Sequence, residues 1–229
     1  MPHRHFLRTG VPLPDGLTGE NIYVALERVR DFFAMIQEKA GINLADITQA
    51  NTFSGIVSNV FTQMLNEVSA YKKNSDQRYP DLINPSNNTG LEVKASNRPM
   101  KGGEGHNGHS GWHIVVCFFL TSEKAIEFSQ VEIANLIGFE EGEKSDWKYC
   151  GSHRNANNSQ RTETYTTTAV GTAKLRDGTI YLNTDYVDLS KGIMTHRHKL
   201  VCQLPIPDYS PFKTTKAAPD KDLPTQELP

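Results

Sequence analysis

The stretch PDLINPSNNTGLEVKA, residues 80–95, contains two short runs, DLIN and LEVKA, joined by PSNNTG. The proline, asparagine and glycine of the joining segment are residues that turns favour, and the flanking runs are typical of strands. The stretch therefore predicts a β-hairpin. Because side chains two residues apart on a strand point to the same face, Glu92 and Lys94 share a face of the second strand, and Asp81 lies at the start of the first.

Two amphipathic helices are predicted before this hairpin. Between residues 21 and 40, apolar side chains recur at steps of three and four, and Gly41 stands where a helix-ending glycine is expected. A second apolar stripe runs between residues 54 and 71, with Glu67 at its margin. The apolar positions are Ile22, Leu26, Val29, Phe33 and Ile36 in the first helix, and Val57, Val60, Phe61, Met64, Leu65 and Val68 in the second.

A polar glycine-rich loop and a buried strand are expected after the hairpin. RPMKGGEGHNGHSG is too rich in glycine to pack, whereas the following WHIVVCFFL is almost wholly apolar, as in a strand covered on both faces. SEKAIEF begins with a good helix cap, and FSQVEIANLIGF fits a helix or a strand equally well. TAKL and TIYL flank Asp177-Gly178, which predicts a second hairpin, and more sheet is expected through HKLVCQL.

These elements predict an α/β (α+β) chain in which a central mixed sheet is flanked by helices. Residues 1–204 are expected to form a single domain, because 229 residues suffice for one good core. Residues 205–229 contain scattered prolines without apolar periodicity, which indicates a peripheral tail.

Composition excludes several classes of protein. A net charge of −2 argues against a polycation that coats nucleic acid, although a specific enzyme can combine an acidic metal site with a basic groove. The three cysteines, Cys117, Cys150 and Cys202, lack the spacing of a zinc knuckle and favour a reducing cytoplasm. No stretch approaches the roughly twenty apolar residues of a spanning helix, and no leader is apparent, so a soluble chain is expected.

The predicted hairpin gathers groups suited to cleaving phosphodiesters. Magnesium takes one or two carboxylates and keeps reactive waters, so Asp81 and Glu92 are candidate ligands, and the Val93 carbonyl between them is a third oxygen. A lysine beside the cation can orient or deprotonate the attacking water and offset charge in the transition state, which is the role expected of Lys94.

The pattern PD, ten residues, then EVK resembles the PD-(D/E)XK nuclease superfamily and is most similar to type II restriction endonucleases. The resemblance covers residues 54–120. It implies a restriction-endonuclease-like core, metal binding at Asp81 and Glu92, water activation at Lys94 and a further helix carboxylate at Glu67. It further implies a Mg²⁺-dependent, sequence-specific double-stranded DNA endonuclease in the prokaryotic cytoplasm, without a nucleotide cofactor. A repair or junction-resolving nuclease of the same superfamily stays open.

Two segments are candidates for holding DNA, because base and phosphate recognition relies on Arg, Lys, Asn and Gln carried on loops. The first lies within residues 97–111 and offers Arg98, Lys101, His106, Asn107 and His109. The second lies at the start of the added region 150–200 and is the better candidate for sequence readout. It offers His153, Arg154, Asn155, Asn157, Asn158, Gln160 and Arg161. A palindromic target would call for a homodimer, with the helix of residues 21–40 as its candidate interface.

Two other classes of function remain open. His106, His109 and His113, with His196 and His198 later, are consistent with a zinc or iron enzyme, which metal content would reveal. A binding module without catalysis is the other class, and it would bind DNA or protein without cutting.

Overall fold

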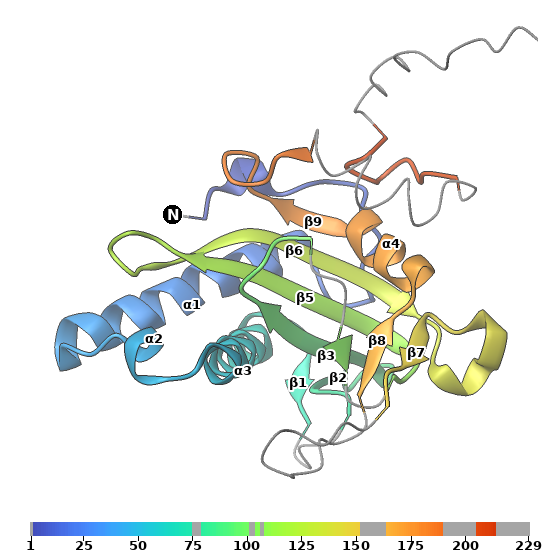
Figure 1. Cartoon of the computed structure of the whole chain (residues 1–229), viewed down its shortest axis with the longest axis horizontal. Helices are drawn as coiled ribbons and strands as arrows, with labels where there is room; N and C mark the ends of the chain where they lie inside the picture. Colours follow the sequence, from blue (N-terminus) through green and yellow to red (C-terminus); the bar gives the residue numbers. More distant parts are fainter. Residues whose placement is uncertain are drawn as a thin grey trace, which may run out of the picture.

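A computed structural model describes residues 2–74, 79–100, 104–105, 108–151, 164–189 and 205–213. In these residues the chain is α+β, with a mixed six-stranded sheet flanked by helices (Figure 1). The order across this sheet is β1, β2, β3, β5, β6, β9, with bounds Lys72–Lys73, Leu82–Asn84, Thr89–Ser96, Gly111–Leu120, Ile126–Leu136 and Thr179–Leu182. A smaller sheet orders β4 (Glu104–Gly105), β8 (Tyr165–Thr167) and β7 (Trp147–Tyr149).

The predicted hairpin is present as β2 and β3, which pair antiparallel with Leu82 opposite Leu91. The buried apolar strand is present as β5, and it pairs parallel with β3, so that Glu92 stands beside His113. β5 then pairs antiparallel with β6. The ambiguous segment after residue 125 is therefore strand, and β5 is central, as its apolar run predicts.

Helices α1 (Gly19–Ala40), α2 (Leu44–Ile47) and α3 (Ala50–Val68) follow the N-terminal 3₁₀ turn η1 (Arg4–Phe6). Both long helices were predicted. The Thr18 hydroxyl and Asn21 amide form a reciprocal cap at the start of α1, and Gly41 ends it at a φ of 64°. Figure 1 shows α1 and α3 on the same side of the main sheet, where their apolar faces pack.

The two faces of the main sheet differ in character. Leu91, Val93 and Ile114 face α1 and α3 in one large apolar core. Val115 and Cys117, which alternate with them, face a smaller apolar cluster under α4 (Ala169–Asp177). Glu92 and Lys94 share this second face, because they alternate with the buried residues of β3.

The expected hairpin around Asp177-Gly178 is wrong. Residues 169–177 form α4 instead, capped at its start by the Thr168 hydroxyl, and Gly178 ends the helix where β9 begins. A Cβ on Gly178 would lie 1.8 Å from the Ile133 carbonyl oxygen, so close packing on β6 explains this glycine better than a hairpin turn does. The expected strand at residues 198–204 lies outside the described residues.

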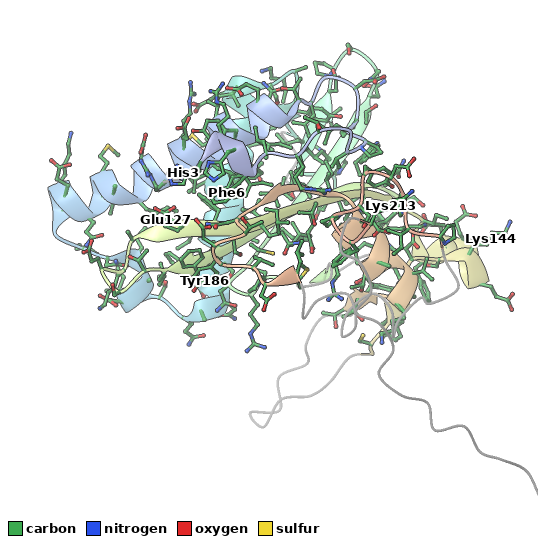
Figure 2. All side chains as sticks on the ribbon, turned by 90° about the horizontal axis from the view of Figure 1, so that it is seen from above. His3, Phe6, Glu127, Lys144, Tyr186 and Lys213 are labelled. Atoms are coloured by element: carbon green, nitrogen blue, oxygen red, sulfur yellow. The ribbon has the colours of Figure 1, made fainter. Side chains whose placement is uncertain are left out.

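Both ends of the described chain pack on β9. Leu7 bridges Tyr181, and the Arg8 N–H donates to the Ile180 carbonyl at 2.9 Å. Phe212 is buried in a cluster with Met100, Leu182 and Val187. This contact was not predicted, because residues 205–229 show no apolar periodicity and were expected to be peripheral. In Figure 2, His3 and Phe6 lie at the N-terminal segment beside α1, whereas Lys144, which ends the 3₁₀ segment η2 (Phe139–Lys144), lies at the opposite end of the molecule.

None of the helices in the described ranges combines the length and the apolar character that crossing a bilayer requires.

Candidate active site

The hairpin brings Asp81, Glu92 and Lys94 together, as their spacing predicts. The Val93 N–H donates to Asp81 Oδ2 at 2.8 Å, and the Asp81 N–H donates to Glu92 Oε2 at 3.3 Å. Lys94 Nζ donates to Glu92 Oε1 at 2.6 Å. The side chains of Glu92 and Lys94 are 13% and 31% exposed, so the cluster is partly shielded but open to solvent on one side.

Packing below the site explains why the hairpin holds this geometry. Leu82 and Leu91 are fully buried and paired in register, which anchors both strands one residue from the acidic groups. A Cβ on Gly90 would lie 2.4 Å from Pro80 Cγ. Glycine at position 90 therefore lets the residue before Asp81 lie flat against the second strand.

The carboxylate of Asp81 has a raised pKa. Burial is the main cause, and the nearby charge of Glu92 adds to it, whereas the Val93 N–H and the Lys94 charge act in the opposite direction. A pair of carboxylates whose negative charges oppose each other is stabilised by a cation between them. This electrostatic state is the one expected of a metal-binding pair.

Val93 takes part through its backbone. Its N–H and C=O point to the side of β3 where Asp81 lies, since both groups of a strand residue face the same neighbour. The carbonyl oxygen accepts a hydrogen bond from Ser58 Oγ of α3 at 3.0 Å. Ser58 thus ties the proposed oxygen ligand to the helix, a contact that sequence alone did not indicate.

His113 is a further residue at the site that motif spacing did not single out with the triad. It stands in register with Glu92 through the parallel pairing of β3 and β5. Its Nδ1 lies 2.9 Å from the Gly111 carbonyl oxygen, which can only accept, so the proton of the neutral ring lies on Nδ1. Burial lowers the pKa of His113 to about 4, so the ring is neutral at physiological pH.

A wall of side chains closes one side of the site. The Tyr79 ring packs on His109 with 4.5 Å between centroids and on His113 with 5.9 Å. The Tyr79 hydroxyl donates to the Ser110 carbonyl at 2.7 Å, and Ser110 Oγ donates to Glu140 at 2.9 Å. These bonds connect the start of β5 with η2 and keep His109 next to the segment that leads into Asp81.

Glu67 is not part of this cluster. It lies near the C-terminal end of α3, where Arg28 Nη1 donates to it at 3.0 Å and Gln63 Nε2 donates to it at 3.0 Å. Position at the margin of an apolar stripe does not reveal which neighbour a side chain meets, and α1 supplies that neighbour.

The predicted DNA-contacting residues are only partly described. Arg98 is exposed just beyond the end of β3, and its N–H donates to Ser96 Oγ at 3.2 Å. His109 packs on Tyr79, with 4.5 Å between the ring centroids. The others lie outside the described residues: Lys101, His106, Asn107, His153, Arg154, Asn155, Asn157, Asn158, Gln160 and Arg161, together with His196 and His198.

The donor atoms gathered at this hairpin suit magnesium. In the described ranges, no three His, Cys, Asp or Glu side chains are grouped as a metal held wholly by side chains would need. Two carboxylates and a backbone carbonyl are an all-oxygen set, and magnesium completes such a set with water. Asp81, Glu92 and Val93 are the residues that would hold the ion.

Comparison with family models, with curated protein sequences and with solved structures gave no match for this chain.

Proposed function

We propose that this chain is a Mg²⁺-dependent endonuclease that cuts double-stranded DNA at specific sequences, built on a restriction-endonuclease-like core. The observation that carries the proposal is the contact set on one hairpin: two carboxylates linked through backbone N–H groups, with a lysine 2.6 Å from one of them. A bound magnesium ion would supply positive charge and an acidified water at this place.

Each of the chain's own groups has a role in this proposal. Asp81 and Glu92 bind and orient the cation, and the hairpin N–H groups fix their carboxylates in place. Lys94 holds a positive charge where the phosphate oxygens gain negative charge in the transition state. Half-burial of the pair strengthens these electrostatic interactions relative to water.

Sequence specificity and a homodimer belong to the same proposal. They are supported by the resemblance in the hairpin pattern and by the polar composition of residues 97–111 and 151–163. Cutting both strands of a palindromic target requires two active sites related by a two-fold axis.

Mapped plasmid and phage DNAs, incubated with the purified protein and either Mg²⁺ or EDTA, test the proposal. We expect discrete fragments with Mg²⁺ only, and a loss of at least about a thousandfold in rate for Asp81→Asn, Glu92→Gln and Lys94→Ala. Lys124→Ala is the matched control, since Lys124 is an exposed lysine paired with Asp46 and away from the hairpin. That variant keeps full activity.

Thermal unfolding supplies a second readout that does not depend on cleavage. Mg²⁺ raises the midpoint of the wild type by binding the folded state, and Asp81→Asn abolishes this rise. Cutting of branched DNA only would instead assign the chain as a junction-resolving nuclease. The absence of both cleavage and a Mg²⁺-dependent rise would contradict the nuclease assignment, and zinc in the purified protein would point to the histidine-metal class.

A further inference from the structure

A buried polar cluster lies under α4, on the face of the sheet that carries Glu92 and Lys94. Gln130, Glu132 and Thr179 are each 0% exposed, and Arg176 of α4 is 7% exposed. The strand register connects this cluster with the site, because Lys94 pairs with Val115 and Val115 pairs with Glu132. Glu132 therefore stands two strands away from Lys94 in one row across the sheet.

The cluster binds the backbone of Met100 on both sides. The Met100 N–H donates to Gln130 Oε1 at 2.9 Å, and Arg176 Nη2 donates to the Met100 carbonyl oxygen. Glu132 and Thr179 orient the Gln130 amide, since its Nε2 donates to Glu132 Oε1 at 3.0 Å and to Thr179 Oγ1 at 2.9 Å. The amide oxygen is thereby directed at Met100.

Met100 itself is held in an uncommon backbone conformation. Its φ is 56°, a left-handed value that residues other than glycine adopt only when their surroundings require it. Its side chain is buried with Leu182, Val187 and Phe212. Two hydrogen bonds and an apolar socket together fix this one residue.

Burying a glutamate, a glutamine and an arginine costs free energy of folding, and an apolar cluster of the same size would avoid that cost. Only polar side chains, however, can bind a backbone N–H and a backbone carbonyl that have left the sheet. The composition of the cluster is therefore explained by the segment that it holds.

That segment is the exit from the catalytic strand. β3 ends at Ser96, and Asn97, Arg98 and Pro99 are exposed before the chain reaches Met100. Arg98 thus lies between two fixed points, Ser96, whose hydroxyl accepts the Arg98 N–H, and Met100. Residues 97–99 therefore connect the end of β3 to Met100, and hydrogen bonds hold the backbone at Arg98 and at Met100.

We propose that Gln130, Glu132 and Arg176 are positioning residues that fix Arg98 beside the site, so that its guanidinium contacts a DNA phosphate next to the bond that is cut. This proposal rests on the proposed nuclease function. The anchor acts on DNA affinity rather than on the chemical step, because it does not touch Asp81, Glu92 or Lys94.

Gln130→Met tests the anchor, since methionine keeps the length of the side chain and removes its oxygen and nitrogen. Ser129→Ala is the matched control, because Ser129 is on the same strand, is 0% exposed and donates to the Cys117 carbonyl outside the anchor. Arg176→Lys, which keeps the positive charge and removes the planar donor pair, is a second variant that stays informative if Gln130→Met does not fold.

Three measurements are made on the full chain: amide hydrogen exchange at Met100, the Kd for a duplex of the mapped site with Ca²⁺ in place of Mg²⁺, and single-turnover cleavage at saturating duplex. For both anchor variants we expect the rate of amide exchange at Met100 and the Kd for the duplex each to rise about tenfold, because one or two hydrogen bonds are lost. The single-turnover cleavage rate is expected to change by less than about twofold. Arg98→Ala raises Kd to a similar extent and leaves exchange at Met100 unchanged. Ser129→Ala leaves all three as in the wild type.

Unchanged exchange at Met100 would overturn the anchor, and a fall in cleavage rate at unchanged Kd would overturn its role in DNA affinity. A wild-type chain that binds no duplex contradicts the proposed function and the DNA role together. The exchange measurement separates that failure from a failure of the anchor itself, because it requires no DNA.

Discussion

The hairpin both positions Asp81 and Glu92 and supplies hydrogen-bond donors to their carboxylates. Backbone N–H groups of Val93 and Asp81 take the place of water around the two carboxylates. Such donors hold each oxygen in a fixed direction before any cation arrives, so little reorganisation accompanies binding. The contact of Ser58 with the Val93 carbonyl extends this fixed arrangement to α3.

Glu132 gives the protein a stability that depends on pH. Burial raises the pKa of its carboxyl group to about 8 from 4.5, so between these values the folded state retains a proton that the unfolded state has lost. The stabilisation that comes from the protonated Glu132 carboxyl group is complete below pH 4.5 and is lost as the pH rises through 8. The expected loss across this window is about 5 kcal/mol in the free energy of unfolding.

Denaturant unfolding of the wild type and Glu132→Gln at several pH values measures this effect. Glutamine keeps the oxygen that accepts from Gln130 and has no proton to lose, so the variant becomes more stable than the wild type at pH 9. Parallel curves for the two proteins would show that Glu132 does not titrate in this window.

At the level of single residues, only part of the site could be predicted from sequence. Asp81, Glu92 and Lys94 follow from a local pattern, because strand alternation and one turn bring them together. His113 joins them through the parallel register of β3 and β5, which a local pattern does not reveal. Glu67 was expected at the site because the resemblance implies a further helix carboxylate, but it pairs with Arg28 of a different helix instead.

Among the elements, the hairpin depends on one close approach. Gly90→Ala would place a Cβ 2.4 Å from the Pro80 ring, which must then move and take Asp81 with it. We expect a loss of about 1–3 kcal/mol in the free energy of unfolding and a clear fall in the Mg²⁺-dependent rise of the unfolding midpoint. Circular dichroism melts with and without Mg²⁺ measure both quantities.

Gly55→Ala is the control for this prediction. Gly55 lies within α3, and no atom lies within 4 Å of a Cβ built there. Alanine at this position stabilises the helix by about 0.5–1 kcal/mol and leaves the Mg²⁺ response unchanged. A Gly90→Ala variant that behaves like Gly55→Ala would refute the close approach.

The two long helices, the hairpin and β5 were predictable because their apolar periods are clear. α4 was not predicted, because the threonine-rich segment before it and the Asp177-Gly178 pair are typical of a hairpin. In the structure Thr168 caps the helix and Gly178 ends it. β6 stayed ambiguous for a physical reason as well. Gln130 and Glu132 are buried on it, and buried polar side chains break the alternation that identifies a strand.

In the molecule as a whole, residues 205–213 pack against segments that are distant in the sequence. Arg8 Nη2 donates to the Tyr209 carbonyl at 2.8 Å, and Ser210 Oγ donates to Asp177 at 2.7 Å. Phe212 is 1% exposed beside Met100. Residues 205–213 therefore support the socket that holds the exit from β3.

Phe212→Ala tests this long-range support. Truncating a buried phenylalanine costs about 3–5 kcal/mol in the free energy of unfolding, and here it also removes one wall of the Met100 socket. Denaturant unfolding measures the loss. Phe139→Ala, at a phenylalanine that is 42% exposed, is expected to change stability by less than about 1 kcal/mol. Equal losses in the two variants would show that the buried contact of Phe212 is not formed in solution.

The two edge strands of the main sheet, β1 and β9, affect how copies of this chain can associate. β1 is two residues long, and both of its lysines, Lys72 and Lys73, are exposed, while β9 is bridged on its outer side by the segment around Leu7. Short, charged or covered margins prevent the strand-to-strand growth that leads to aggregation and domain swapping. A homodimer of the kind proposed would therefore be joined through helices or loops and not by pairing of the two main sheets.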